Sequence, residues 1–229
     1  MKKLVLLLAL AIVGFMSFTS KPAPTTFKVD ASKSTFKWTG KKVTGSHWGY
    51  IKFTEGSVML DKGALVGGAF TIDMNSMNCQ DLEAGKGAEK LVGHLKADDF
   101  FGTDKFPTAS LKIKSTSPKG NNMYDVKADL TIKGITEEIT FPATIAVAGG
   151  ALTATANFNI DRTKFGIKYG SGSFFENLGD KAISNDFQVE VNLAANGDVA
   201  AAPAPAASKK ITPKKAGKSA AKKATGTGK

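Results

Sequence analysis

The sequence predicts an all-β protein of eight antiparallel strands, with one short helical segment between the third and fourth strands. In most stretches between Phe27 and Leu193, apolar and polar residues alternate with a period of two. This is the pattern of a strand whose one face is buried and whose other face is exposed to solvent. Short turns that carry glycine separate the stretches, as at Lys62-Gly63. Such turns join antiparallel neighbours, so the dry faces of consecutive strands are expected to meet.

The first four strands are bounded by glycine turns, and the second is long, with a break or bulge expected at Gly56. The third places Phe70, Ile72 and Met74 on one face. We expect these four strands around Phe36 and Trp38, at 48–60, at 65–74, and around Ala109, Leu111 and Ile113.

The last four strands follow the same pattern, and the fifth shows it without interruption. Its apolar positions, Val126, Ala128 and Leu130, alternate with polar residues such as Lys127 and Asp129. We expect these four strands at 124–132, 139–147, 152–160 and 187–193.

The segment between the third and fourth strands has helical character. Ala88, Leu91, Val92 and Leu95 have the i, i+3, i+4, i+7 spacing of an amphipathic helix. A short turn or helix that ends near Lys96 is therefore expected, and it is placed to cap one mouth of a barrel.

The N-terminal residues predict export. Two lysines precede an apolar run from Leu4 to about Phe18, which is too short for a typical membrane span. We interpret 1–20 as a cleaved Sec-type signal peptide and 21–26 as a short linker; an uncleaved anchor is the alternative. The single cysteine, Cys79, lies far downstream, so no lipidated cysteine is available at the signal junction. The mature protein is expected in the periplasm or outside the cell.

The net charge of +11 is concentrated at the two ends of the chain. The signal region carries two lysines, and residues 200–229 carry eight lysines and no acid. The remaining 21–199 hold 21 basic and 20 acidic residues, a net of +1. We expect 196–229 to be a disordered basic tail rich in Lys, Ala and Pro. The tail either binds anionic polymers or membrane surfaces weakly by electrostatic attraction, or serves only as a solubilising extension. Specific recognition of nucleic acid is not expected.

Eight antiparallel strands form either a sandwich or a closed barrel, and a barrel of this size is either filled by side chains or holds one slender ligand. Small residues such as Gly68, Ala154 and Ala156 lie on the expected inner faces beside large rings. They either leave space for a ligand or accommodate the rings of facing strands.

Several short motifs, in order along the chain, resemble the signature of the YceI-like family. They are Gly49-Tyr50, the run KLVGHLKADDFF at 90–101 with KFPTA at 105–109, LTIKGIT at 130–136, and DRTKFGI at 161–167. The resemblance covers about 27–195. It implies an eight-stranded, lipocalin-like antiparallel barrel in the periplasm that binds a polyisoprenoid, an isoprenoid quinone or another long-chain apolar lipid in its lumen, with no cofactor of its own and no enzymatic activity.

The inward-facing and cap residues are then the candidate ligand-binding residues. The lumen set is Phe36, Trp38, Tyr50, Phe70, Ile72, Leu91, Leu95, Phe100, Leu111, Ile113, Val126, Ala128, Leu130, Ala154, Ala156, Phe158, Phe187 and Val189. Residues 169–180 are expected to form a glycine-rich rim whose Phe174, Phe175 and Leu178 are available to the lipid or to the mouth of the barrel.

The polar candidates near the lipid head group are Arg162 and His94. Arg162 is expected either to pair with Asp161, Asp99 or Asp186 as a structural clasp or to bind a phosphate. Many relatives carry Arg-Asp directly before the His-Leu of the signature, where this chain has Val92-Gly93. The role of that arginine is therefore vacant here or filled by Lys90, Lys96 or Arg162.

The two histidines and the cysteine do not predict a catalytic or metal site. His94 is expected to hydrogen-bond a neighbouring backbone group, and His47 to be only a surface residue. Two histidines without a thiolate or carboxylate motif predict no metal site, and Cys79 has no recognisable base partner. A lipid carrier or sequestering protein is the leading hypothesis. An enzyme acting on a bound lipid, or a scaffold held to anionic polymers by its tail, is the alternative.

Overall fold

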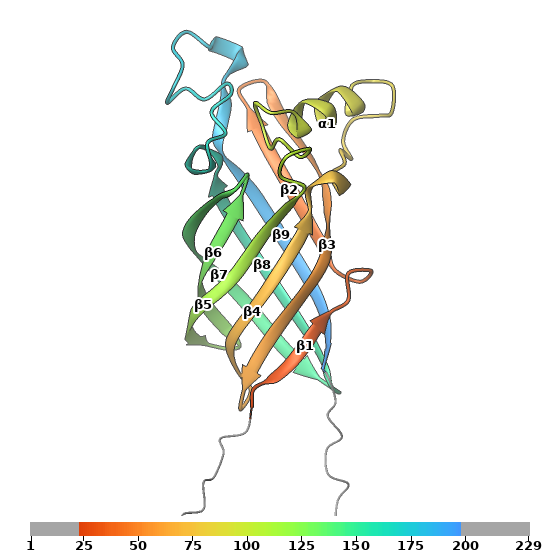
Figure 1. Cartoon of the computed structure of the whole chain (residues 1–229), viewed down its shortest axis with the longest axis vertical. Helices are drawn as coiled ribbons and strands as arrows, with labels where there is room; N and C mark the ends of the chain where they lie inside the picture. Colours follow the sequence, from red (N-terminus) through yellow and green to blue (C-terminus); the bar gives the residue numbers. More distant parts are fainter. Residues whose placement is uncertain (1–22, 198–229) are drawn as a thin grey trace, which may run out of the picture. The chain divides into compact units, whose positions relative to one another are not determined.

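The computed structural model describes residues 23–197, which form an antiparallel barrel with one α-helix at its upper end (Figure 1). Its strands are β1 (Thr25–Val29), β2 (Thr35–Lys42), β3 (Gly45–Asp61), β4 (Ala64–Asp73), β5 (Thr108–Gly120), β6 (Met123–Ile132), β7 (Ile135–Ala148), β8 (Ala151–Asp161) and β9 (Ile183–Gly197). The helices are α1 (Ala88–Lys96) and the 3₁₀ turns η1 (Met74–Ser76), η2 (Arg162–Phe165) and η3 (Gly179–Lys181).

The sheet closes on itself with eight strand positions, which confirms the predicted barrel. From β2 to β9 each strand pairs with the next along the chain, and β9 pairs back onto β2. The short strand β1 occupies the same position as β2, because both lie between β3 and β9. Closure gives each strand from β2 to β9 a neighbour on both sides along at least part of its length, which reduces the sheet edge available to pair with another chain.

The break between β1 and β2 is a turn built on Asp30. Its carboxylate accepts hydrogen bonds from the backbone N–H of Ser32 (3.1 Å) and from the hydroxyl of Ser32 (2.6 Å). These bonds, with the ion pair to Lys33, lower the pKa of Asp30 to about 2. The periodicity did not reveal β1, since five residues before a turn carry too short a pattern.

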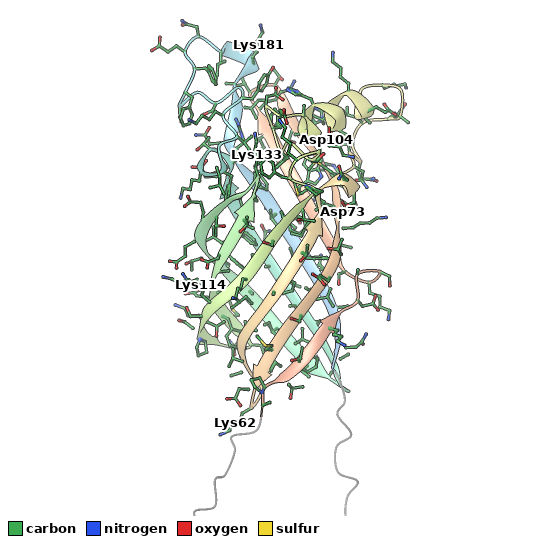
Figure 2. All side chains as sticks on the ribbon, viewed as in Figure 1. Lys62, Asp73, Asp104, Lys114, Lys133 and Lys181 are labelled. Atoms are coloured by element: carbon green, nitrogen blue, oxygen red, sulfur yellow. The ribbon has the colours of Figure 1, made fainter. Side chains whose placement is uncertain are left out.

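The alternation in each strand separates a polar outer face from an apolar interior. On β6, Val126, Ala128, Leu130 and Ile132 are buried. On the outer face, Lys114 of β5 bonds Glu138 of β7 at 2.9 Å (Figure 2). Exposed pairs of this kind contribute little to stability, so the interior faces hold the barrel together.

Residues 76–81 seal the sheet beyond the end of β4, which pairs with β3 only as far as Lys52. Side-chain oxygens of Ser76, Asn78 and Asp81 accept the backbone N–H groups of Lys52, Tyr50 and Trp48 at 2.8, 2.8 and 2.9 Å. In return, the backbone N–H groups of Asn78 and Gln80 donate to Tyr50 and Trp48. The segment thus provides hydrogen-bond partners for the backbone groups of residues 48–52 in β3, as a neighbouring strand would.

The close approach of this segment requires glycine at position 49. A Cβ built on Gly49 would lie 1.9 Å from the carbonyl oxygen of Asn78 and 3.0 Å from the Trp38 ring. Only a residue without a side chain lets β3, the segment 76–81 and the Trp38 ring meet at this point.

Helix α1 lies at the upper end of the barrel, where the sequence predicts a cap (Figure 1). Leu91 and Leu95 pack against the core. Lys133, in the turn after β6, donates to the carbonyl oxygen of Asp98 at 2.6 Å and so ties the end of the cap to the barrel. Among residues 23–197, no helix has both the length and the apolar character needed to cross a membrane.

Candidate ligand-binding cavities of the barrel

Two adjoining cavities lie in the barrel that residues 23–197 form, one above the other. The upper cavity, beside α1, has a volume of about 190 Å³, and the lower cavity has about 90 Å³. Phe36, Ile72, Leu111 and Phe158 line both. The two cavities therefore adjoin at these four side chains.

The upper cavity is lined mainly by apolar side chains from the upper strands and from α1. Met74 and Met77 reach it from the segment that seals β3, and Leu91 and Leu95 reach it from the cap. Its other apolar residues are Phe36, Trp38, Ile51, Ile72, Phe100, Phe101, Ala109, Leu111, Leu130, Ile132, Phe158, Ile160, Ile183 and Phe187.

The lower cavity is almost wholly apolar, and aromatic rings form the boundary above it. Phe36 packs edge-on against Phe53 at a centroid distance of 5.9 Å, and Phe158 stacks on Phe141 at 4.3 Å. The remaining lining residues are Val58, Leu65, Phe70, Ile72, Leu111, Ile113, Val126, Ala143, Ile145, Ala154, Thr155, Ala156, Val191 and Leu193.

The structure places most of the predicted lumen residues on these cavity walls, with three exceptions. Tyr50 is 37 % exposed and contacts Trp48 on the outer face, so the prediction that it lines the lumen is wrong. Alternation along β3 turns Gly49 and Ile51 inward and therefore Tyr50 outward. Ala128 and Val189 are fully buried, but neither lines a cavity, because neighbouring side chains cover them.

Several wall residues escaped the sequence analysis. Ile51 and Phe53 lie in register with the alternation of β3, and a stricter reading of that pattern would have found them. Met74 ends the predicted third strand on the same face as Phe70 and Ile72 but was not among the proposed lining residues, and Met77 follows in a stretch without strand or helix periodicity. Only the tertiary structure reveals that this stretch folds over the upper cavity.

Arg162 is buried in the wall of the upper cavity, with 3 % of its surface exposed. Its guanidinium donates to the carbonyl oxygens of Ser184 (2.9 Å), Ile167 (2.8 Å) and Ile183 (3.1 Å). Its expected ion pair with Asp161, Asp99 or Asp186 is wrong: within residues 23–197 no carboxylate lies within ion-pair distance of it. Arg162 is instead a clasp on backbone carbonyls. Burial lowers the pKa of its guanidinium.

His94 lies at the mouth of the upper cavity among aromatic rings. Its Nε2 is 2.9 Å from a carboxylate oxygen of Asp99, and its ring meets Phe100 and Tyr169 edge-on at centroid distances of 4.9 and 4.7 Å. The partner is thus a carboxylate, and the expected bond to backbone is wrong. The bond to Asp99 joins α1 to the turn that follows it, and the contact with Tyr169 joins the cap to residues beyond β8.

His47 also lines the upper cavity and is more than a surface residue. Its Nδ1 lies 2.8 Å from Asp81, whose other carboxylate oxygen accepts from Cys79 at 3.3 Å. Burial would raise the pKa of Asp81, but hydrogen bonds from Trp48, His47 and Cys79 bring it below its usual value. Burial, with the nearby carboxylate, raises the pKa of the Cys79 thiol, which is the opposite of what activates a nucleophile. No cluster of metal-ligating side chains occurs in residues 23–197.

No residue of the expected rim at 169–180, Leu178 included, lines either of the two cavities. Ser171 is buried and bonds Asn185 at 2.6 Å, which fixes the base of the loop. Phe174 and Phe175 are 48 % and 50 % exposed, and the Lys168 ammonium lies over the Phe174 ring at 4.6 Å. Neither ring lines a cavity in this structure.

The barrel and its apolar cavities agree with what sequence comparison finds. A family model described as a YceI-like domain matches residues 27–195. The chain belongs to the YceI-like family. The curated relatives include a UPF0312 protein of Shewanella denitrificans, 30 % identical over 104 residues that cover 43 % of this chain and 52 % of the relative. A UPF0312 protein of Vibrio cholerae is 26 % identical over 155 residues, 65 % of this chain and 77 % of the relative. The chain spans about half the length of the first of these relatives.

Solved structures show the same barrel. BcnA of Burkholderia cenocepacia is 26 % identical, superposes with a TM-score of 0.61, and covers 73 % of this YceI-like chain and 99 % of BcnA. A structure described as a polyisoprenoid binding domain from Saccharophagus degradans is 16 % identical, with a TM-score of 0.53, over 74 % of this chain and 97 % of that domain. At that identity, the second likeness concerns the fold alone.

Proposed function

We propose that this YceI-like protein binds a long-chain apolar lipid, a polyisoprenoid or an isoprenoid quinone, in its barrel and carries or sequesters it in the periplasm. The observation that carries the proposal is the pair of apolar cavities stacked along the barrel. Two further points support it: residues 1–20 have the sequence pattern expected of an export signal, and a structure with this fold is described as a polyisoprenoid binding domain.

Hydrophobic burial supplies the driving force. Each methylene transferred from water to an apolar site contributes about 0.8 kcal/mol. An apolar cavity of about 150 Å³ holds a molecule as large as benzene, so the upper cavity of about 190 Å³ has room for one segment of a chain. A longer chain needs the lower cavity too. The Phe36 and Phe158 rings, which line both cavities, must then turn aside, so we propose that they set the length of chain admitted.

Organic extraction of the purified protein, followed by mass spectrometry, tests this function. We expect a long-chain lipid to copurify at up to one molecule per protein, and native mass spectrometry to show the same complex. Protein that contains no lipid and takes up neither a polyprenol nor a quinone would refute the proposal.

The cap should control exchange more than affinity. Replacing Leu91 and Leu95 together by serine is expected to speed lipid exchange several-fold while β content is kept, because both residues lie on α1, outside the sheet. Stopped-flow transfer of a fluorescent prenyl lipid to vesicles measures the rate. Glu89→Ser and Lys90→Ser together, on exposed positions of the same helix, provide the control. Cooperative unfolding of the leucine variant would make α1 part of the core instead of a lid.

The basic tail supports an accessory role, as a weak anchor to anionic polymers or membrane surfaces. Residues 198–229 lie outside the described part, as does the signal peptide, but Asn196 and Gly197 belong to β9, and Thr25 and Thr26 of the expected linker belong to β1, so those two predicted boundaries are wrong. A chain that ends at Asn196 should keep the barrel and its lipid but elute from heparin at clearly lower salt than the full chain, since residues 21–199 have a net charge of only +1. Elution of both chains at the same salt concentration would place the basic surface on the barrel.

A further inference from the structure

The upper cavity contains a hydrogen-bond donor without an acceptor. Trp38 lines this cavity and is 9 % exposed. Its indole Nε1 is buried and, alone among the buried side-chain nitrogen and oxygen atoms of residues 23–197, has no hydrogen-bond partner. Buried polar groups are almost always paired, because an unmade hydrogen bond is costly. The orphan donor therefore points to an acceptor that a ligand supplies.

Arg162 adds a second, independent donor to the same wall. A guanidinium has five N–H donors, and three of these bond backbone carbonyls. Two remain. No carboxylate of the described residues lies within ion-pair distance of the buried guanidinium, which contacts the Phe100 ring at 5.8 Å and the three carbonyls, so an electron-rich oxygen in the cavity would add a favourable partner.

The other charged residues on the cavity wall agree with this. Lys41 and Lys42 line the mouth, whereas Asp186 is the only carboxylate on the wall, and it is exposed. His47 Nδ1 and His94 Nε2 already interact with the carboxylates of Asp81 and Asp99. The polar part of the upper cavity thus offers donors and positive charge in excess of acceptors.

We propose that Trp38 and Arg162 form a recognition site for an acceptor oxygen on the lipid, a carbonyl, carboxylate or phosphate oxygen, and so orient its polar end inside the upper cavity. This inference rests on the lipid-binding function proposed above and specifies the polar chemistry of the ligand. The apolar chain then extends toward Phe36 and Phe158 and the lower cavity.

A ligand series tests the proposal on the wild-type protein. Squalane, a hydrocarbon, is compared with prenyl chains that end in a quinone, a carboxylate or a phosphate. We expect the oxygen-bearing chains to bind more tightly than the hydrocarbon, and the order among the three identifies the head group. Squalane that binds as tightly as all of them would overturn this inference and leave the lipid-binding function standing. Failure of every chain to bind would instead refute the function itself.

Two tryptophan variants assign the effect to Trp38. Trp38→Phe removes the N–H donor and keeps an aromatic ring, so affinity for the preferred oxygen-bearing chain should fall about five- to tenfold, as for loss of one hydrogen bond, with affinity for squalane reduced much less. Trp48→Phe, on the outer face, should change neither. Equal losses for both ligands in Trp38→Phe would show a packing role and overturn the assignment.

Fluorescence gives a readout that does not depend on mutating Trp38. The chain has two tryptophans, so Trp48→Phe leaves Trp38 as the only indole emitter. A hydrogen bond to its Nε1 should shift the emission to longer wavelength when the oxygen-bearing chain binds, whereas squalane should not. Identical spectra with the two ligands would contradict the proposed bond.

Discussion

Gly49→Ala is expected to destabilise the barrel by about 3 kcal/mol or more, at the upper end of what overpacking costs. The new Cβ would lie 1.9 Å from the Asn78 carbonyl oxygen, between two stretches of backbone, so no side-chain rotation relieves the clash. Displacing Asn78 also breaks the bonds that pair residues 76–81 with β3 and moves Met77 off the cavity wall. Thermal and denaturant unfolding measure the loss, which corresponds to a fall in melting temperature of roughly 6 °C or more for a domain of this size.

Gly93→Ala is the matched control, because the same methyl group is added where it meets nothing within 4 Å. Gly93 lies inside α1, where alanine is favoured over glycine by roughly 0.5–1 kcal/mol. The control should therefore leave stability unchanged or raise it slightly. If Gly49→Ala proves as stable as Gly93→Ala, the close packing of Asn78 on β3 is not a constraint on the fold.

Ala109→Phe should remove most of the lipid, with a fall in bound lipid of at least tenfold. Ala109 lies on β5 in the wall of the upper cavity, so the phenyl ring enters the volume of about 190 Å³ that the chain would fill. The overpacking cost of about 1–3 kcal/mol leaves the barrel folded if the ring occupies that space. Lipid extraction and circular dichroism, run on the same sample, report the two effects.

Two other substitutions test whether a loss of lipid in Ala109→Phe comes from filling the upper cavity. Ser110→Phe adds the same ring on the outer face of the same strand and should leave the lipid in place. Phenylalanine at both Ala154 and Ala156 fills the lower cavity and should exclude long chains while shorter ones still bind. If Ala109→Phe and Ser110→Phe retain lipid equally, the ligand does not occupy the upper cavity.

Local sequence patterns predict correctly the features that depend on a single strand or a single helix. The unbroken alternation of β6 placed Val126 and Leu130 inside, and the spacing of Leu91 and Leu95 predicted α1. Tyr50 shows how such reasoning fails. It is included among the inward-facing residues, although strand alternation sends it outward. Arg162 was misassigned because a sequence displays nearby carboxylates but not the carbonyls that a fold brings close.

Sequence periodicity predicted β2 to β9, their apolar faces and the helical cap, because these features depend on residues two to four positions apart. The closure of β9 onto β2, the pairing of β3 with residues 76–81, and the positions of the two cavities become apparent only in the folded barrel. Each of these depends on residues distant in the chain, as when Arg162 reaches Ser184 or Phe36 meets Phe53. Periodicity states which way a side chain points. What it meets there is set by packing between strands, and the unpaired donor of Trp38 appears only when those partners are in place.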